Sequence, residues 1–157
     1  MRIGFGNDIH RLEKDRPLIL GGVKIESELG AVGHSDADAL LHAITDAILG
    51  ALALGDIGSH FSDNNEKWKN ADSRIFLAEA VRMMKEKNYR VANVDSIINL
   101  EKPKLRPHIK KMRERIAHIL EVELNQVSVK AKTGEMLDAV GKNLAVKAEA
   151  VVLLIKN

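Results

Sequence analysis

The chain of 157 residues contains no cysteine. This absence excludes disulfide bonds, thiolate zinc sites, iron–sulfur clusters held by thiolates and a cysteine nucleophile. Any metal ion must therefore bind to histidine, aspartate or glutamate. Aromatic residues are also scarce, with one Trp, one Tyr and three Phe. So few rings can hardly form the stacking platform that a single-strand nucleic-acid binder needs.

An excess of charge of one sign is also lacking, because 24 Lys and Arg residues face 22 Asp and Glu residues, a formal net charge of +2. This balance argues against a protein built mainly to bind nucleic acid or an acidic membrane. The longest apolar-rich stretch, residues 37–54, is interrupted by Asp38, His42 and Asp46, so we expect it not to span a membrane. Residues 1–16 are rich in charge and show no signal peptide. The sequence therefore predicts a cytoplasmic protein.

The length and a hydrophobic content of 45% are typical of a single domain, residues 1–157. Residue patterns predict strands at 2–11, 18–20, 23–25, 91–100, 127–132 and 145–155, helices at 35–54, 72–88 and 107–121, and a loop at 56–71. This alternation predicts an α/β (α+β layered) fold, in which helices pack on one face of a mixed β-sheet. The last strand is apolar on both faces after Glu149, so it should be central or lie at an interface.

Glycine and small polar residues mark three local features. Gly4 and Gly6 within the first strand indicate a close backbone approach or a bulge. Gly21-Gly22 between two short apolar runs predicts a hairpin. Ser35 and Asp38 have the spacing of a capping box, so we expect Ser35 to cap the following helix.

Two groups of residues could bind a metal ion. Asp8 and His10 are two positions apart in a predicted strand and so point to the same face, although an ordinary surface pair is equally compatible. Asp38, His42 and Asp46 form a polar stripe on a helix that is otherwise apolar, and such a stripe indicates a metal, a substrate or an internal hydrogen-bond network. Asp8, His10 and His42 together would give zinc three ligands and an open fourth position, the catalytic pattern.

Other polar segments offer phosphate-binding chemistry. His34 and Ser35 precede a helix N-terminus, which attracts anions, although Ser35 as a simple cap and His34 as a loop residue are an alternative. Residues 132–135 follow a strand and offer a hydroxyl, backbone N–H groups and a carboxylate, which suit phosphates and a hard cation such as Mg²⁺. The basic run 102–115 is typical of a solvated helix face, with a phosphate or nucleic-acid patch as the alternative.

The combined motifs resemble the 2-C-methyl-D-erythritol 2,4-cyclodiphosphate synthase family of the non-mevalonate isoprenoid pathway. The matching stretches follow the family order: residues 2–10, 21–23, 34–38, 41–43, 45–47, 55–58, 71–74, 93–95, 103–104 and 129–131. The resemblance implies a homotrimer around a central axis, with active sites between neighbouring subunits. It also implies a lyase reaction that converts 4-diphosphocytidyl-2-C-methyl-D-erythritol 2-phosphate to 2-C-methyl-D-erythritol 2,4-cyclodiphosphate and CMP, by attack of the 2-phosphate on the β-phosphate.

The same resemblance implies the roles of individual residues. Asp8, His10 and His42 would hold Zn²⁺ or another divalent ion, and Glu135 would hold Mg²⁺ or Mn²⁺ at the diphosphate. His34 and Thr133 would stabilise the transition state. The implied substrate contacts are Asp8, Ile9, His10, His34, Ser35, Asp56, Ile57, Gly58, Phe61, Ser62, Asp63, Asn64, Asn65, Leu100, Lys102, Pro103, Lys104, Leu105, Arg106, Lys132, Thr133, Gly134, Glu135 and Lys142.

The C-terminal part departs from the family pattern. Lys132 stands where the family usually has Thr, Ala139 replaces Phe, Lys142 replaces Arg and Leu144 replaces Glu. Lysine lacks the bidentate fork with which arginine binds phosphate. We therefore expect the channel along the trimer axis to bind an isoprenoid diphosphate only weakly.

Two alternative functions use the same residues differently. A zinc-dependent phosphoester hydrolase would combine Asp8, His10 and His42 with an activated water, but no general base is identifiable from the spacing. A non-enzymatic binding module would use the basic run 102–115. The absence of a recognisable protein nucleophile accords with the cyclase, because its nucleophile is the substrate's own phosphate.

Overall fold

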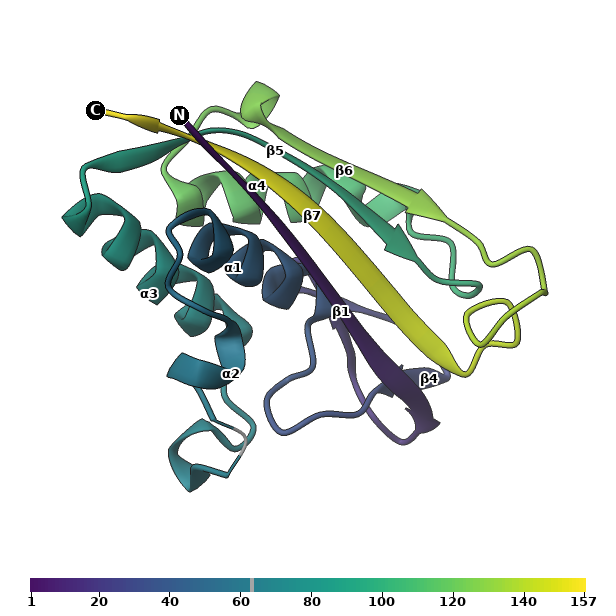
Figure 1. Cartoon of the computed structure of the whole chain (residues 1–157). Helices are drawn as coiled ribbons and strands as arrows, with labels where there is room; N and C mark the ends of the chain where they lie inside the picture. The colour runs from purple at the N-terminus through teal and green to yellow at the C-terminus, as the bar shows by residue number, and fades with distance from the viewer. Residues whose placement is uncertain (63) are drawn as a thin grey trace.

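The computed structural model, which describes residues 1–62 and 64–157, contains a five-stranded sheet in the order β4-β1-β7-β5-β6 and a separate β2-β3 hairpin (Figure 1). The strands are β1 (Arg2–Lys14), β2 (Leu18–Leu20), β3 (Val23–Ile25), β4 (Leu29–Ala31), β5 (Tyr89–Asn99), β6 (Val127–Lys132) and β7 (Ala145–Lys156). The helices are α1 (Ala39–Ala51), α2 (Ile57–His60), α3 (Ser73–Glu86) and α4 (Ile109–Leu120), with the 3₁₀ turns η1 (Glu66–Trp68), η2 (Arg106–His108) and η3 (Leu124–Gln126). Because β5 and β6 are parallel and the β1-β4, β1-β7 and β5-β7 pairs are antiparallel, the sheet is mixed, as predicted.

The helices α1, α3 and α4 lie on one side of the sheet (Figure 1). Along β7 the side chains of Val146, Ala148, Val152 and Leu154 are buried, whereas Val151 on the opposite face is exposed. The alternation confirms that one face of the sheet packs on helices, and the position of β7 confirms that the last strand is central. Within the described residues, the helices are too short or too polar to cross a bilayer.

The contact between α1 and β1 depends on the two strand glycines. A Cβ atom added to Gly4 would lie 1.7 Å from the carbonyl oxygen of Ala47, and one added to Gly6 would lie 2.1 Å from that of Ala43. The close backbone approach that the sequence indicated is therefore confirmed. It places the N-terminal half of α1 directly over Asp8.

The capping box expected at Ser35 is wrong. Asp38 is the N-cap of α1, and its carboxylate accepts hydrogen bonds from Leu41 N at 3.1 Å, Gly21 N at 2.9 Å and Gly22 N at 2.7 Å. The helix cannot start at Ser35 because Ala37 has a φ of +56°, in the left-handed region. The predicted helix 35–54 is thus shortened to 39–51, and the Gly21-Gly22 hairpin, confirmed here, is anchored to its N-terminus.

Two short elements escaped the sequence prediction. The segment 56–71, expected to be a loop, contains α2 and η1, and β4 was not predicted at all. Helix α2 depends on a local cap, since the Asp56 carboxylate accepts from Ser59 N at 2.8 Å. An element of three or four residues carries too few side chains to show a hydrophobic period.

The sheet face turned away from the helices, here called the open face, carries exposed apolar side chains. Ile3 is 69% exposed, Phe5 and Ile9 are each 57% exposed, and Val151 is 44% exposed. Ile3, Phe5 and Val151 lie next to one another in the β1-β7 register, in which Ile3 pairs with Leu153 and Phe5 with Val151, whereas the polar pair of Asn7 and Glu149 separates Ile9 from them. A contiguous apolar patch of this kind is typical of a protein–protein interface.

Candidate functional site

Asp8, His10 and His42 come together as the sequence suggested and form the Asp-His-His cluster. The Oδ2 atom of Asp8 lies 2.8 Å from Nε2 of His10 and 2.9 Å from Nδ1 of His42. The three potential ligand atoms lie within 4.8 Å of one another, an arrangement that could hold a metal ion. Asp8 and His10 project from the helix face of β1, and His42 projects from the first turn of α1.

Hydrogen bonds on the far side of each ring orient the two histidines. Nδ1 of His10 lies 2.9 Å from the carbonyl oxygen of Val32, which can only accept, so this nitrogen carries the proton and donates it. Nε2 of His42 lies 2.8 Å from Oγ of Ser73 and 3.2 Å from Oγ of Ser35. The remaining nitrogen of each ring is directed toward Asp8. One carboxylate and two imidazoles are a donor set that fits Zn²⁺.

The charge in the cluster is concentrated on Asp8. Burial acts to raise the pKa of Asp8, but hydrogen bonds and positive charge from His10 and His42 outweigh it and hold that pKa well below its usual range. Burial acts to lower the pKa of His10, but the Asp8 carboxylate and the Val32 carbonyl raise it above its usual value of 6.5. Asp8 is therefore ionised at neutral pH and attracts a cation into the cluster.

The three residues of the polar stripe, Asp38, His42 and Asp46, have two different roles. Asp38 is fully buried and satisfied by backbone N–H groups, and burial raises its pKa to about 6. Asp46 accepts from Ile57 N at 2.7 Å, and burial together with nearby Asp56 raises its pKa. The hydrogen-bond alternative thus holds for these two aspartates, and His42 alone of the stripe joins Asp8 and His10.

A cavity of about 290 Å³ opens next to the cluster. Besides the three cluster residues, it is lined by Gly33, His34, Ser35, Ile57, Gly58, Phe61, Trp68 and Phe76. His34, Ser35, Ile57, Gly58 and Phe61 were expected from the sequence, whereas Gly33, Trp68 and Phe76 were missed. The two missed aromatic rings pack edge-on at 5.6 Å between centroids, and a lone aromatic residue in a chain gives no signal of that partner. At the N-terminus of α1, where the sequence suggested an anion site, the Asp38 carboxylate takes the N–H group of Leu41, so an anion there would meet a carboxylate.

Asn65 lies beside this cavity. His34 is held there, since its Nε2 lies 3.1 Å from the carbonyl oxygen of Asn65. Ser62 and Asn64 are exposed, and Ser62 Oγ accepts from Asn64 N at 3.3 Å. Asp63 lies outside the described residues, so its expected role stays a prediction.

The remaining predicted residues form a second group, the 100–106/132–135 group. Leu100 N donates to Lys132 O at 2.9 Å, and Gly134 N donates to Oε2 of Glu101 at 3.0 Å. Thr133 Oγ1 lies 2.8 Å from Oε1 of Glu135, which confirms that a hydroxyl and a carboxylate meet at the end of β6. Lys142 is exposed in the turn before β7 and joins neither group.

Sheet register separates the second group from the cluster within one chain. Ile9, Lys147, Asn99 and Lys132 occupy one row across β1, β7, β5 and β6. Three strand spacings put Lys132 roughly 14 Å from Ile9. Residues in one row point to the same face, so Lys132 lies on the open face, whereas Asp8 and His10 point to the helix face.

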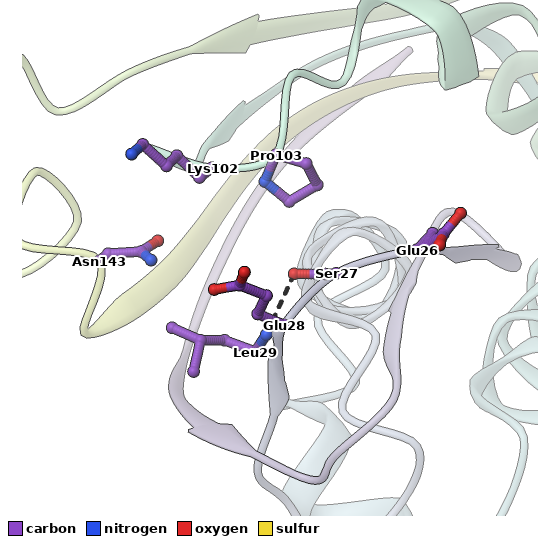
Figure 2. A pocket seen from close by; sticks show the side chains of 7 residues that line it. All are labelled: Glu26, Ser27, Glu28, Leu29, Lys102, Pro103 and Asn143. Atoms are coloured by element: carbon purple, nitrogen blue, oxygen red, sulfur yellow. Dashed lines mark hydrogen bonds between the residues drawn. The ribbon is translucent and has the colours of Figure 1, made fainter.

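A further cavity of about 570 Å³ borders the second group (Figure 2). It lies between the segment 26–29, which leads into β4, and Lys102-Pro103 after β5, with Asn143 at its edge. Lys102 and Pro103 are among the substrate contacts that the family resemblance implies. This cavity shares no lining residue with the one at the Asp-His-His cluster, so the two are distinct.

Fold and cluster together define an α/β protein with a candidate metal centre of one carboxylate and two imidazoles. The chain belongs to the YgbB family, which matches residues 1–155. It is 54% identical over 156 residues to 2-C-methyl-D-erythritol 2,4-cyclodiphosphate synthase of Fusobacterium nucleatum, covering 99% of this chain and 98% of that protein. The synthase of the same name from Nostoc punctiforme is 52% identical over 156 residues, with the same coverage.

A solved structure of a 2C-methyl-D-erythritol-2,4-cyclodiphosphate synthase, described as a bound form with CDP, has the same fold. Its TM-score to this chain is 0.91 at 41% identity, covering 98% of this chain and 100% of that one. The similarity therefore extends over nearly the whole length of this chain and all of the other. The family resemblance drawn from the sequence motifs is confirmed.

Proposed function

We propose that the chain, as a single cyclodiphosphate synthase domain, converts 4-diphosphocytidyl-2-C-methyl-D-erythritol 2-phosphate to 2-C-methyl-D-erythritol 2,4-cyclodiphosphate and CMP in isoprenoid precursor biosynthesis. The relatives that carry this synthase name match nearly all of the chain. The observation that carries the proposal is the Asp-His-His cluster at the mouth of a cavity. The hydrolase alternative finds no support among these relatives, and the cyclisation needs no side-chain nucleophile.

Asp8, His10 and His42 would hold Zn²⁺, because two nitrogen donors and one carboxylate suit zinc better than Mg²⁺ or Ca²⁺. A zinc ion supplies Lewis-acid polarisation of a phosphate oxygen when bound. The protein contributes alignment and neutralisation of charge, which are the main demands of phosphoryl transfer. His34, fixed by the Asn65 carbonyl, lines the same cavity and stabilises the charge that develops in the transition state.

The 132–135 loop would bind the diphosphate group of the substrate. Glu135, exposed at the end of β6, would hold a Mg²⁺ or Mn²⁺ ion. The Thr133 hydroxyl, which donates to the Glu135 carboxylate in this structure, would donate to a phosphate oxygen once the cation occupies that carboxylate. Lys132 adds a positive charge where relatives of the family usually have a hydroxyl. Residues 100–106 hold the cytidine, and the segments 56–58 and 61–65 contact the methylerythritol and ribose groups.

The two halves of this site require more than one copy of the chain. Lys132, at the start of the 132–135 loop, lies roughly 14 Å from Ile9 across the sheet and on the open face, whereas Asp8 and His10 point to the helix face. A homotrimer in which the open faces surround a central axis would bury Ile3, Phe5 and Val151 and bring the cluster of one subunit to the loop of its neighbour. A cyclic assembly of this kind supplies three equivalent sites.

The axis of such a trimer offers little to an isoprenoid diphosphate. Glu149 on the open face is already paired, since its Oε1 lies 2.9 Å from Nζ of Lys147. Lys142 presents a single ammonium in place of the arginine fork. We therefore expect weak binding of such a ligand, and we expect the enzyme to act in the cytoplasm without nucleic-acid or membrane partners.

The products of the reaction test the function. Incubation of the zinc-loaded chain with the cytidylated substrate should release CMP in proportion to the substrate consumed, without inorganic phosphate. A phosphoester hydrolase would release inorganic phosphate from the 2-position instead. Release of inorganic phosphate, or no release of CMP in the presence of zinc and Mg²⁺, contradicts the proposal.

A further inference from the structure

His42 contacts a buried polar pair on the side of its ring that faces away from Asp8. Its Nε2 atom lies 2.8 Å from Oγ of Ser73, which is fully buried in the first turn of α3. The Ser73 hydroxyl also bonds Oδ1 of Asp36, and the Ser73 N–H donates to Oδ2 of the same carboxylate at 3.1 Å. Asp36 therefore accepts from both the hydroxyl and the backbone N–H of Ser73.

The carboxylate fixes the direction of the hydrogen bonds along this series. An ionised carboxylate only accepts, so Ser73 must give its single hydroxyl proton to Asp36. The Ser73 oxygen can then only accept from His42, which requires a proton on Nε2. A neutral imidazole carries one ring proton, so Nδ1 of His42 keeps a lone pair. That nitrogen is the atom that lies 2.9 Å from Asp8.

We propose that Ser73 and Asp36 are positioning residues of the metal centre, which hold the ring orientation and tautomer of His42 so that Nδ1 is available as a ligand. This inference rests on the metal centre of the proposed function. Partners that hydrogen-bond to a ligand imidazole raise its basicity, and their removal weakens metal binding by about 10- to 100-fold. Neither residue lines the cavity next to the cluster, so both act through His42.

A purely structural role makes a different prediction. Asp36 and Ser73 also join the segment before α1 to the start of α3. If this were their only role, substitution would lower the free energy of unfolding and leave the zinc affinity of the folded protein unchanged. The zinc affinity of the folded variants is therefore the quantity that separates the two roles.

The test measures zinc affinity by competition with a chromophoric chelator, on the full chain checked for folding by circular dichroism. Ser73→Ala should bind zinc about 10- to 100-fold more weakly. Asp36→Asn should also weaken zinc binding. The amide of Asn can donate to the Ser73 oxygen, and the Ser73 hydroxyl would then donate to Nε2 of His42, which moves the ring proton to Nδ1. Ser96→Ala is a control for the loss of a buried hydroxyl elsewhere, because Ser96 in β5 donates to the carbonyl oxygen of Ser128 in β6. It should leave the zinc affinity within about twofold of the wild type.

Ser35→Ala is the matched control at the same ring nitrogen. It removes the longer contact of 3.2 Å but leaves the Ser73–Asp36 series intact, so the zinc affinity should again stay within about twofold. In the zinc-loaded wild type the Nε2–H proton of His42 should exchange slowly with solvent in ¹H–¹⁵N NMR spectra. It should exchange faster in Ser73→Ala.

Several results would overturn the inference. If folded Ser73→Ala and Asp36→Asn bind zinc as tightly as the wild type, the inference is wrong but the proposed function is intact. The inference is also wrong if Ser35→Ala weakens zinc binding as much as Ser73→Ala does. If Ser73→Ala does not fold, the nearly isosteric Asp36→Asn decides the question. A wild type that binds no zinc overturns the metal centre itself, and the inference with it.

Discussion

Nε2 of His10 and Nδ1 of His42 lie 3.3 Å apart, although one residue belongs to a strand and the other to a helix 32 positions later. Both nitrogens are also within 2.9 Å of the same Asp8 oxygen. Two nitrogen lone pairs that face each other repel unless a positive charge lies between them. The cluster is therefore a place where the protein holds a proton or a metal ion.

Removal of one imidazole tests the cluster as a metal site. His42→Ala should weaken zinc binding by more than the about 100-fold that loss of a hydrogen-bonding partner can cost, because a ligand is lost outright. Zinc should then be removed by dialysis, while circular dichroism reports a folded chain. The measurement is the metal content of the dialysed protein. Retention of one zinc ion per chain by this variant would contradict the assignment.

The contact between α1 and β1 predicts opposite effects for two glycine substitutions. Gly4→Ala would place a Cβ atom 1.7 Å from the Ala47 carbonyl oxygen, so α1 must move, and we expect a loss of at least about 3 kcal/mol in the free energy of unfolding. Gly50→Ala is the matched control, because the nearest atom, Phe5 O, is 3.9 Å from the added Cβ. Removal of a helical glycine should stabilise by about 0.5–1 kcal/mol.

Urea unfolding of both variants measures these effects. Equal stability of Gly4→Ala and the wild type would show that α1 does not need its close approach to β1. The placement of His42 over Asp8 would then depend on other contacts.

The buried cap Asp38 gives the stability a pH dependence. Burial raises the pKa of Asp38 to about 6 from its usual 3.8, so the folded chain binds this proton more tightly than the unfolded chain. The contribution of Asp38 to the free energy of unfolding therefore falls as pH rises from about 4 to about 6 and is level above that, by at most on the order of 3 kcal/mol. Asp38→Asn does not titrate, so the stability of the wild type relative to this variant should fall over that window.

Urea unfolding at several pH values from about 4 to about 7 checks the sign of this effect. The relative stability of wild type and Asp38→Asn should be constant between about pH 6.5 and 7. A wild-type advantage that grows as the pH rises from about 4 to about 6 would show that the backbone N–H groups around Asp38 outweigh its burial.

The open face predicts the behaviour of an interface variant. Phe5 is 57% exposed within the apolar patch, so Phe5→Glu should disrupt the proposed trimer without disturbing the helix side of the sheet. Sedimentation velocity should show a trimer for the wild type and monomers for the variant. A wild type that sediments as a monomer contradicts the proposed assembly.

Much of the fold was predictable because it depends on periodic patterns. The apolar residues on both faces of β7 indicated a central strand or an interface, and the glycines of β1 indicated a close backbone approach, which is the contact with α1. Asp8 and His10 were predicted to share a face because a strand has a period of two. Their meeting with His42 followed only from the apolar surroundings of that histidine and from the family resemblance.

What was missed depends on contacts between distant segments. The sequence predicted Ser35 as the cap of α1 and Asp38 as its partner three residues later. Asp38 is instead the N-cap itself, and the Gly21-Gly22 turn supplies two of its hydrogen bonds from outside the helix. Ser73 and Asp36 lie in stretches that match the family, but the sequence predicted no role for them, because the proposed role depends on a ring nitrogen in another element. Trp68 and Phe76 meet across a loop that has no hydrophobic period.

The central claim is that the cluster of one subunit and the 132–135 loop of another form one site, and a mixing experiment tests it most directly. His42→Ala lacks the metal half and Glu135→Ala lacks the loop half, so each alone should release little CMP. In mixed trimers at equal ratio, about a quarter of the sites combine two intact halves, and CMP release should recover to about a quarter of the wild-type rate. A mixture, shown by mass spectrometry to contain mixed trimers, that is no more active than the separate variants would contradict the claim.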